Sequence, residues 1–255
     1  RVEKIDYRMD EEQVPERVHI YKVESPVKDK LESLGMLLRS LGDQSTIVFL
    51  NYRDSVERTN KYLVEQGFST SFFHGGLEQK EREASLYRFS NGSANILVST
   101  DLASRGLDIP DIDNIIHYHM PESEDGYIHR VGRTARWEAQ GRAFFLLGPE
   151  EHIPDYVDAE VEDYEIPAVE ELPMPAKPKM ATLYIGKGKK DKISKGDILG
   201  FLCKKGGLNS SEIGKIDVND RYAYAAIARP KLKSVLNNVK GEKIKGVKTI
   251  VEEVR

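Results

Sequence analysis

The sequence predicts an α/β protein: a parallel sheet with flanking helices, followed by a smaller α+β domain of split βαβ order. Between residues 18 and 147, short apolar runs alternate with longer segments of helical period, which is typical of parallel strands joined by crossover helices. Beyond residue 180 the expected order is strand, helix, strand, strand, helix, strand. We therefore expect a first domain at 1–172, a Pro-rich linker at 173–179 and a basic second domain at 180–255.

In the first domain, strands are expected where apolar residues run together and helices where they recur at helical spacing. The expected strands are 18–23, 46–51, 70–73, 95–100, 114–118 and 143–147, and the expected helices are 27–41, 53–66 and 78–89. Most of these strands are too apolar to face water on either side. Ser25 and Pro26 are the expected N-cap and first residue of the first helix. In the second domain we expect strands at 182–185, 213–218, 221–227 and 249–254, and helices at 196–203 and 230–239.

Charge is divided unevenly along the chain. Residues 1–176 hold 19 Lys and Arg against 34 Asp and Glu, whereas residues 177–255 hold 19 against 8. A basic appendage on an acidic body suggests a polyanionic partner, and a solvated lysine-rich surface is the alternative. No run approaches the roughly 18 apolar residues of a membrane span, and Cys203 is the single cysteine and cannot form an internal disulfide. We expect a soluble, monomeric, cytoplasmic protein without a membrane partner.

Three arginines recur in the segment HRVGRTAR at 129–136. Arg130, Arg133 and Arg136 are three residues apart, so a short helix would set them close together, where like charges repel by roughly a few tenths of a kcal/mol. An anion between them would explain the cluster. A triphosphate is the obvious candidate, because a guanidinium group donates two parallel hydrogen bonds to phosphoryl oxygens. Ion pairing with Asp101 or Asp108 is the structural alternative.

Two other segments follow expected strands. STDLASRGLDIP at 99–110 emerges at a strand's carboxyl end, where α/β proteins usually build their sites. Asp108 could accept a hydrogen bond from a ribose hydroxyl, while Thr100, Arg105 and the backbone of Gly106 could approach phosphates; a turn at Gly106 and a cap at Asp108 are the alternatives. HGGLEQKER at 74–82 places two glycines before a helix, an arrangement that binds phosphates elsewhere but is weak evidence alone.

Taken together, IVFLNYR at 47–53, HGGLEQKER, STDLASRGLDIP and YIHRVGRTAR resemble the second RecA-like lobe of DEAD-box RNA helicases over about residues 15–150. The resemblance implies that Arg133 and Arg136 are arginine fingers for the γ-phosphate of ATP. It also implies that Asp108, with Gly106 beside it, contacts the nucleotide and that His129 and Arg130 link ATP contacts to the lobe interface. The resemblance associates a further set of positions with the RNA backbone or with loops that contact the RNA: Arg53, Gly75, Gly76, Gln79, Arg82, Thr100 and Arg105. Ala135 and residues 137–140 depart from the family pattern, which puts the local loop shape in doubt.

Neither G-x-x-x-x-G-K-[ST] nor D-E-A-D occurs in the sequence. By resemblance these parts, which hold ATP and Mg²⁺, belong to a first lobe before Arg1, a residue that is not an initiator methionine. We expect an RNA-stimulated ATP hydrolase and RNA helicase as the full-length protein, and no ATPase activity from this fragment alone. The alternatives are a DNA helicase lobe, which DNA rather than RNA would stimulate, and a non-enzymatic RNA-binding scaffold, which an upstream phosphate cradle would argue against.

The basic domain has two candidate RNA-binding surfaces. TLYIG at 182–186 and, more loosely, RYAYAAI at 221–227 resemble the short motifs of an RNA-recognition fold, so the domain is expected to be RRM-like. Alternation puts Tyr222 and Tyr224 on one face, where Tyr184 could join them to stack on bases; ordinary strand tyrosines are the alternative. The loop at 186–195 holds Lys187, Lys189, Lys190, Lys192 and Lys195. Five phosphate contacts there would give a log–log salt slope of about −3.5 to −4.5.

The segments GKGKKDKISKGDILG, SSEIGKIDVND and KIKGVKT occur in the order seen in the C-terminal module of the DbpA group of bacterial DEAD-box helicases, which they resemble. That resemblance implies recognition of structured large-subunit ribosomal RNA and a role in ribosome assembly. Whether RNA meets the sheet face or the lysine-rich loop stays open at this point.

Overall fold

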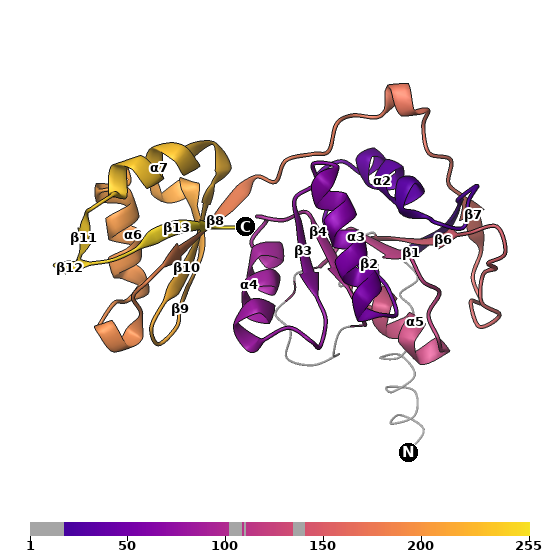
Figure 1. Cartoon of the computed structure of the whole chain (residues 1–255), viewed down its shortest axis with the longest axis horizontal. Helices are drawn as coiled ribbons and strands as arrows, with labels where there is room; N and C mark the ends of the chain where they lie inside the picture. The colour runs from indigo at the N-terminus through magenta and orange to yellow at the C-terminus, as the bar shows by residue number, and fades with distance from the viewer. Residues whose placement is uncertain (1–17, 102–108, 110, 135–140) are drawn as a thin grey trace, which may run out of the picture. The chain divides into compact units, whose positions relative to one another are not determined.

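The computed structural model describes residues 18–101, 109, 111–134 and 141–255. The chain divides into two compact units, and the boundary between them along the chain falls between Lys177 and Pro178. The first unit comprises Arg1–Phe89 and Asn95–Lys177, and the second comprises Ser90–Ala94 and Pro178–Arg255. Figure 1 shows the elements of both units. None of the helices in the described residues combines the length and the apolarity needed to cross a membrane.

The first unit is built on a seven-stranded sheet in the order β3-β4-β2-β5-β6-β1-β7, with every described pair of strands parallel. Its strands are β1 (Val18–Glu24), β2 (Thr46–Phe49), β3 (Thr70–Phe73), β4 (Ile96–Ser99), β5 (Asn114–His117), β6 (Gly141–Leu147) and β7 (Val161–Asp163). All residues of β2, β4 and β5 are buried, as expected for central strands covered on both faces. The predicted α/β fold is confirmed, and β7 was not foreseen.

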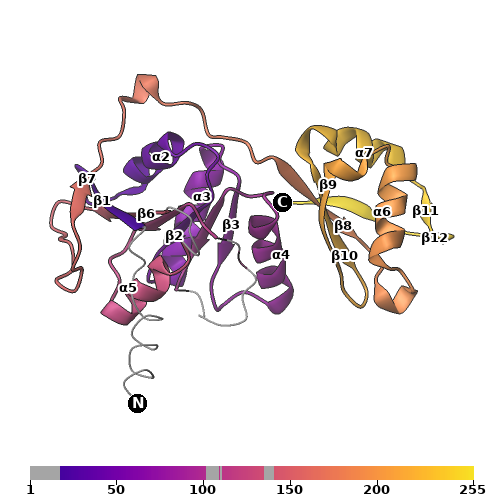
Figure 2. The same ribbon diagram turned by 180° about the vertical axis from the view of Figure 1, so that it is seen from behind.

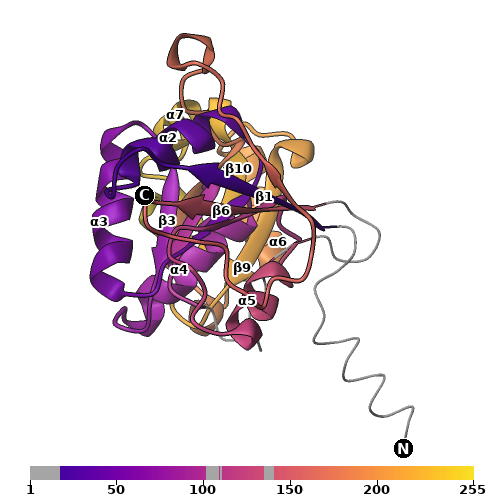
Figure 3. The same cartoon turned by 90° about the vertical axis from the view of Figure 1, so that its right-hand side faces the viewer.

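Helices cover both faces of this sheet (Figure 3). They are α2 (Leu31–Ser40), α3 (Arg53–Glu65), α4 (Gln79–Ser90) and α5 (Glu124–Val131). Successive residues along a strand point to opposite faces of the sheet. In β2 and the residue after it, Val48 and Leu50 therefore pack with α2 and α3, whereas Ile47 and Phe49 pack with residues of α4 and α5.

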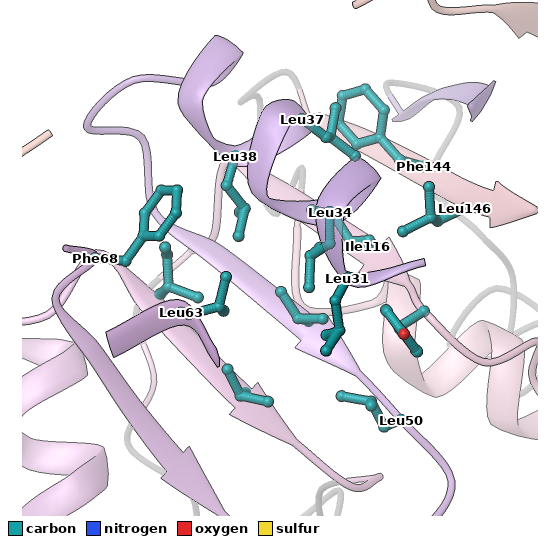
Figure 4. Packing of buried hydrophobic residues seen from close by; sticks show 14 of the residues in the cluster. Leu31, Leu34, Leu37, Leu38, Leu50, Leu63, Phe68, Ile116, Phe144 and Leu146 are labelled. Atoms are coloured by element: carbon teal, nitrogen blue, oxygen red, sulfur yellow. The ribbon is translucent and has the colours of Figure 1, made fainter. Parts of the chain in front are cut away.

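The inward face of α2 is a row of leucines (Figure 4). Leu31, Leu34 and Leu38 recur at helical spacing and belong to the same buried cluster as Ile116 and Phe144 of the sheet. Burying one such side chain fully stabilises the fold by about 1.5–3 kcal/mol. Packing of this row, rather than helix propensity, is therefore the main force that holds α2 in place.

The start of α2 differs from the prediction. Ser25 and Pro26 do not cap or open the helix, because the Ser25 hydroxyl donates to the Val27 carbonyl at 2.7 Å and the N-cap is Lys30. Lys30 is buried, and its ammonium group donates to two strand-end carbonyls and to Glu151 at 2.7 Å. These ties hold the residues before Leu31 in a non-helical path.

The acidic and Pro-rich stretch that follows β6 packs against the first unit. Its strand β7 pairs with β1, and Tyr164 meets Phe144 edge-on with ring centroids 5.1 Å apart. Arg39 donates to the Pro173 carbonyl at 2.8 Å, and Asn95 to the Ala176 carbonyl at 3.3 Å. The first residues of the expected linker at 173–179 are thus bound to the first unit.

The second unit has a four-stranded antiparallel sheet in the order β13-β8-β10-β9. Its main elements are β8 (Met180–Ile185), α6 (Lys195–Lys204), β9 (Ile213–Val218), β10 (Ala223–Ala228), α7 (Leu232–Val239) and β13 (Val251–Val254). A small hairpin of β11 (Lys243–Ile244) and β12 (Val247–Lys248) is added before the last strand. Both helices lie on one side of the sheet (Figure 2), where Ile198 and Val235 pack on Leu183 and Ala225. The predicted split βαβ order is confirmed.

Candidate nucleotide and nucleic-acid site

Segments far apart in the sequence meet at the carboxyl edge of the parallel sheet. The last residues of β2, β3, β4 and β5 are paired in register, so the segments that follow these strands begin side by side. The Thr100 N–H donates to the Phe73 carbonyl at 3.2 Å, and the Asn51 N–H donates to His119 Nδ1 at 2.9 Å. The edge therefore joins IVFLNYR, HGG and STD, as a site at strand ends requires.

Arg130 lies inside this edge rather than on its surface, with only 1% of the residue exposed. Its guanidinium group donates to both carboxylate oxygens of Asp101, at 2.6 and 3.3 Å. It also donates to the Asn51 side-chain oxygen at 2.6 Å and to the His119 carbonyl at 2.8 Å. The ion pair with Asp101 that was the structural alternative for this segment is present, and it ties α5 to the ends of β2, β4 and β5.

Arg133, the next arginine of HRVGRTAR, does not share a helix with Arg130. The helix α5 begins at a Ser123 N-cap, whose hydroxyl accepts from the Gly126 N–H at 3.0 Å, and it ends at Val131. Arg133 follows in a turn and is largely buried, and its carbonyl accepts from Ile112 N–H at 3.0 Å. The expectation that a short helix aligns all three arginines is therefore wrong for Arg133.

His129 points outward from the last turn of α5, with 49% of its side chain exposed and Asp125 at 3.9 Å. Four of the predicted site residues lie outside the described residues: Arg105, Gly106, Asp108 and Arg136.

Two histidines that no sequence motif singled out surround Arg130. His117 is fully buried, stacks on Phe145 with centroids 4.5 Å apart and lies with Nδ1 3.3 Å from Arg130. Burial and the Arg130 charge hold the pKa of His117 well below its usual value. Burial lowers the pKa of His119 to about 4. Both rings are therefore neutral at pH 7, which avoids two further positive charges beside Arg130. The one sequence feature that could have indicated these histidines is their position at the end of the strand expected at 114–118.

The glycines of HGG form a short loop against α3. His74 is buried, its Nδ1 accepts from the Gly76 N–H at 3.0 Å, and its Nε2 lies 2.7 Å from a Glu57 carboxylate oxygen. A Cβ on Gly75 would lie 3.0 Å from Arg53 Nη2, and one on Gly76 would lie 3.4 Å from Arg53 Nη1. The absence of side chains on these glycines thus lets the exposed Arg53 guanidinium rest on the loop.

The remaining candidates of the first unit lie near this loop but differ in role. Gln79, at the start of α4, is exposed and donates to Glu83 at 3.1 Å. Arg82 uses Nε to donate to the Leu77 carbonyl at 3.0 Å, which holds the loop to the helix. Thr100 is half-buried and directly follows β4, whose last residue Ser99 pairs with Phe73, the residue before HGG. The described residues include no group of three His, Cys, Asp or Glu side chains that could hold a metal ion.

In the second unit the three tyrosines come together as predicted, on the face away from the helices. Tyr184 and Tyr222 stack with centroids 5.9 Å apart, and Tyr224 meets each of them edge-on. Tyr224 packs against both of the other rings. Glu252 pairs with Tyr184 and Asp217 pairs with Tyr224 across neighbouring strands. Directly paired residues share a face, so carboxylates flank the tyrosines on both sides.

The lysine-rich loop is exposed and is held by backbone hydrogen bonds. Lys189, Lys190, Lys192 and Lys195 are exposed, and Lys187 is half-buried. The N–H groups of Lys189 and Lys190 donate to the carbonyls of Asn219 and Asp220, both at 2.8 Å. A groove of about 600 Å³ lies beside the loop, between Lys189, Lys192 and Lys195 on one side and strand β9 on the other.

Family comparisons agree with both halves of this description. The helicase conserved C-terminal domain matches residues 29–138, and the DbpA RNA binding domain matches residues 182–253. ATP-dependent RNA helicase DbpA of Escherichia coli is 35% identical over 228 residues, which cover 88% of this chain and 50% of that protein. DbpA of Bacillus subtilis is 30% identical over 245 residues, which cover 86% of this chain and 51% of that protein. The chain belongs to the DEAD-box RNA helicases.

This DEAD-box chain spans about half the length of the DbpA proteins that it matches. The E. coli DEAD-box protein SrmB, solved in a complex with regulator of ribonuclease activity A, is 29% identical with a TM-score of 0.55 and covers 64% of this chain and 99% of its own. A DEAD-box protein from Methanococcus jannaschii is 26% identical with a TM-score of 0.54, covering 60% of this chain and 43% of its own. Both likenesses support the RecA-like second lobe.

Proposed function

We propose that this chain is the second lobe and the RNA-binding module of an ATP-dependent RNA helicase that remodels structured RNA. The observation that carries the proposal is the presence of a helicase conserved C-terminal domain and a DbpA RNA binding domain in one chain. In this proposal a first lobe, joined in cis, makes most of the contacts to ATP and Mg²⁺. Lobe closure then brings Arg133 and Arg136 to the γ-phosphate, where arginine fingers contribute on the order of 10³ to 10⁵ in rate.

The RNA is proposed to be large-subunit ribosomal RNA during its assembly, and the protein to act in the cytoplasm as a monomer. Support comes from the match to the DbpA module and from the excess of basic residues in 177–255. The test is competition binding with a hairpin from large-subunit ribosomal RNA against an unrelated hairpin of the same length. Equal affinity for the two hairpins would contradict a ribosomal target and leave general RNA binding in place.

The fragment alone is proposed to lack ATPase activity, because neither a phosphate cradle nor a D-E-A-D sequence is present. ATP turnover should therefore appear only when the first lobe is joined, and RNA rather than DNA should stimulate it. Arg133→Ala should abolish that turnover. ATP turnover by the pure fragment, if Arg133→Ala removed it, would contradict the proposed inactivity of the fragment. Near-normal turnover of the full-length Arg133→Ala protein would contradict the arginine-finger role.

Within the second unit we assign the RNA contact to the lysine-rich loop rather than to the sheet face. The exposed lysines suit phosphates, whereas the sheet face carries Glu252 and Asp217 beside tyrosines that pack on one another. Replacing Lys189 and Lys192 with Gln should reduce the magnitude of the log–log salt slope by about 1.4–1.8. Tyr184→Leu should leave that slope unchanged, and a large loss of affinity in Tyr184→Leu alone would favour the sheet face instead.

A further inference from the structure

Arg53 and Glu57 lie one turn apart on α3 but do not bond to each other. Residues four apart on a helix are neighbours, so this arginine and this glutamate are placed to form an ion pair. Instead the Glu57 carboxylate lies 2.7 Å from His74 Nε2. In the part of the chain that the structure describes, no carboxylate lies within ion-pair distance of Arg53. The guanidinium group rests on Gly75 and Gly76.

The tautomer of His74 explains why it holds Glu57. Its Nδ1 accepts the Gly76 N–H, so the ring proton of the neutral imidazole is on Nε2 and is donated to the Glu57 carboxylate. The ring is buried between α3 and the loop, and both of its nitrogens are occupied. One side chain thus shapes the glycine loop and binds the carboxylate that would otherwise neutralise Arg53.

We propose that His74 is a positioning residue that sequesters Glu57 and thereby keeps Arg53 available for an RNA phosphate. This inference rests on the proposed function, since it takes Arg53 as an RNA contact. Without the His74 Nε2–H group, the Glu57 side chain would turn to Arg53. The guanidinium group would then form an ion pair within the protein instead of binding an RNA phosphate. The carboxylate would also repel the RNA backbone.

Two substitutions separate the functions of the two ring nitrogens. His74→Gln places an amide N–H near the position of Nε2 and can still hold Glu57, whereas His74→Asn is too short to reach Glu57 and retains a polar group near the position of Nδ1. The double variant His74→Asn/Glu57→Gln removes the carboxylate that competes for Arg53. Lys61→Gln is the matched control, because it removes another exposed charge from the same helix.

Binding of single-stranded RNA to the full chain is measured over a range of salt concentrations. All variants carry Lys189, Lys190 and Lys192 replaced by Gln, so that contacts of the first unit dominate. Arg53→Gln and His74→Asn should each reduce the slope magnitude by about 0.7, the value for one phosphate on a single strand. His74→Gln, Glu57→Gln, Lys61→Gln and the double variant should keep the slope of the background.

A second readout needs no RNA. The NMR resonance of the Arg53 Nε–H group should move in His74→Asn, as Glu57 pairs with it, and return in the double variant. An unmoved resonance in His74→Asn, or a slope that Glu57→Gln does not restore, would overturn the positioning role. A slope unaffected by Arg53→Gln would instead overturn the RNA contact of the proposed function, while the resonance still tests the Glu57–Arg53 competition. Thermal unfolding of each variant identifies any that loses its fold.

Discussion

Replacing Arg130 with alanine should lower the free energy of unfolding of the first unit by about 3–5 kcal/mol, because it removes a buried side chain and the donor of several hydrogen bonds. Arg130 is 1% exposed, whereas 51% of the Asp101 side chain is exposed. Water can therefore rehydrate Asp101, and its share of the loss is small. Most of the cost comes from uncharged acceptors that lose their donor, the Asn51 oxygen and the His119 carbonyl, at about 1–3 kcal/mol each.

The assay is urea unfolding followed by far-UV circular dichroism, with hydrogen exchange of the amides of β2 and β5 to identify the transition of the first unit. For a domain of this size the loss corresponds to a drop in Tm of roughly 6–20 °C. Arg130→Lys should lose less than Arg130→Ala, because it keeps the charge but not the planar fork of donors. Arg58→Ala is the control: its pair with Asp29 is exposed, and the expected loss is below about 1 kcal/mol. A loss of under about 1 kcal/mol in Arg130→Ala would refute the inference that this network holds α5 to the sheet.

Two further predictions concern pH and the lysine-rich loop. The pKa of His119 is about 4 in the folded protein against an ordinary 6.5, so the unfolded state binds more protons between these values, and stability present above pH 6.5 should be lost as the pH falls toward 4. With a discount for partial exposure the share of His119 in this loss is about 1–2 kcal/mol. Unfolding titrations should show that His119→Asn, which retains an acceptor near Nδ1, removes this share and leaves the share of His117, whose pKa is also lowered. If His119→Asn kept the full pH dependence, another group would be responsible. Gly188→Ala places a Cβ 2.1 Å from the Asn219 carbonyl oxygen, so it should destabilise the second unit by about 1–3 kcal/mol or more and weaken RNA binding. Gly200→Ala, with no atom within 4 Å of its Cβ, should instead stabilise α6 by roughly 0.5–1 kcal/mol, and equal unfolding midpoints for the two variants would contradict the packing argument.

Local patterns were sufficient for most of the fold. A strand buried on both faces must be apolar throughout, which made segments such as 46–51 and 114–118 recognisable. Strand β9 begins and ends where its residue pattern predicts, at 213–218. In contrast, the start of α2 depends on Lys30, whose partners are a residue of β6, the residue after β5 and Glu151. Such long-range contacts leave no periodic trace in the sequence.

The candidate site was predictable as a set of segments but not as a set of partners. The motifs place Arg53, Gly75 and Gly76 at strand ends, and the structure brings them into contact. The motifs could not predict that Asn51 and His119 accept hydrogen bonds from Arg130. These bonds depend on the register between neighbouring strands, which the order of residues in a motif does not give. The strand β7 escaped prediction for a similar reason: its residues are mostly acidic, and only pairing with β1 makes them a strand.

The burial of Arg130 decides how its variants should be interpreted. Arg130 bonds the residue after Thr100 on one side and the end of β2 on the other, so its removal disturbs the candidate RNA edge and the segment leading to Arg133 together. Lost activity in Arg130→Ala would therefore be explained by lost structure alone. Arg130→Lys at a temperature where it stays folded is the more informative comparison. If its turnover and RNA affinity both follow the folded fraction, Arg130 acts only through the structure, and the chemical role falls to the arginines beyond the end of α5.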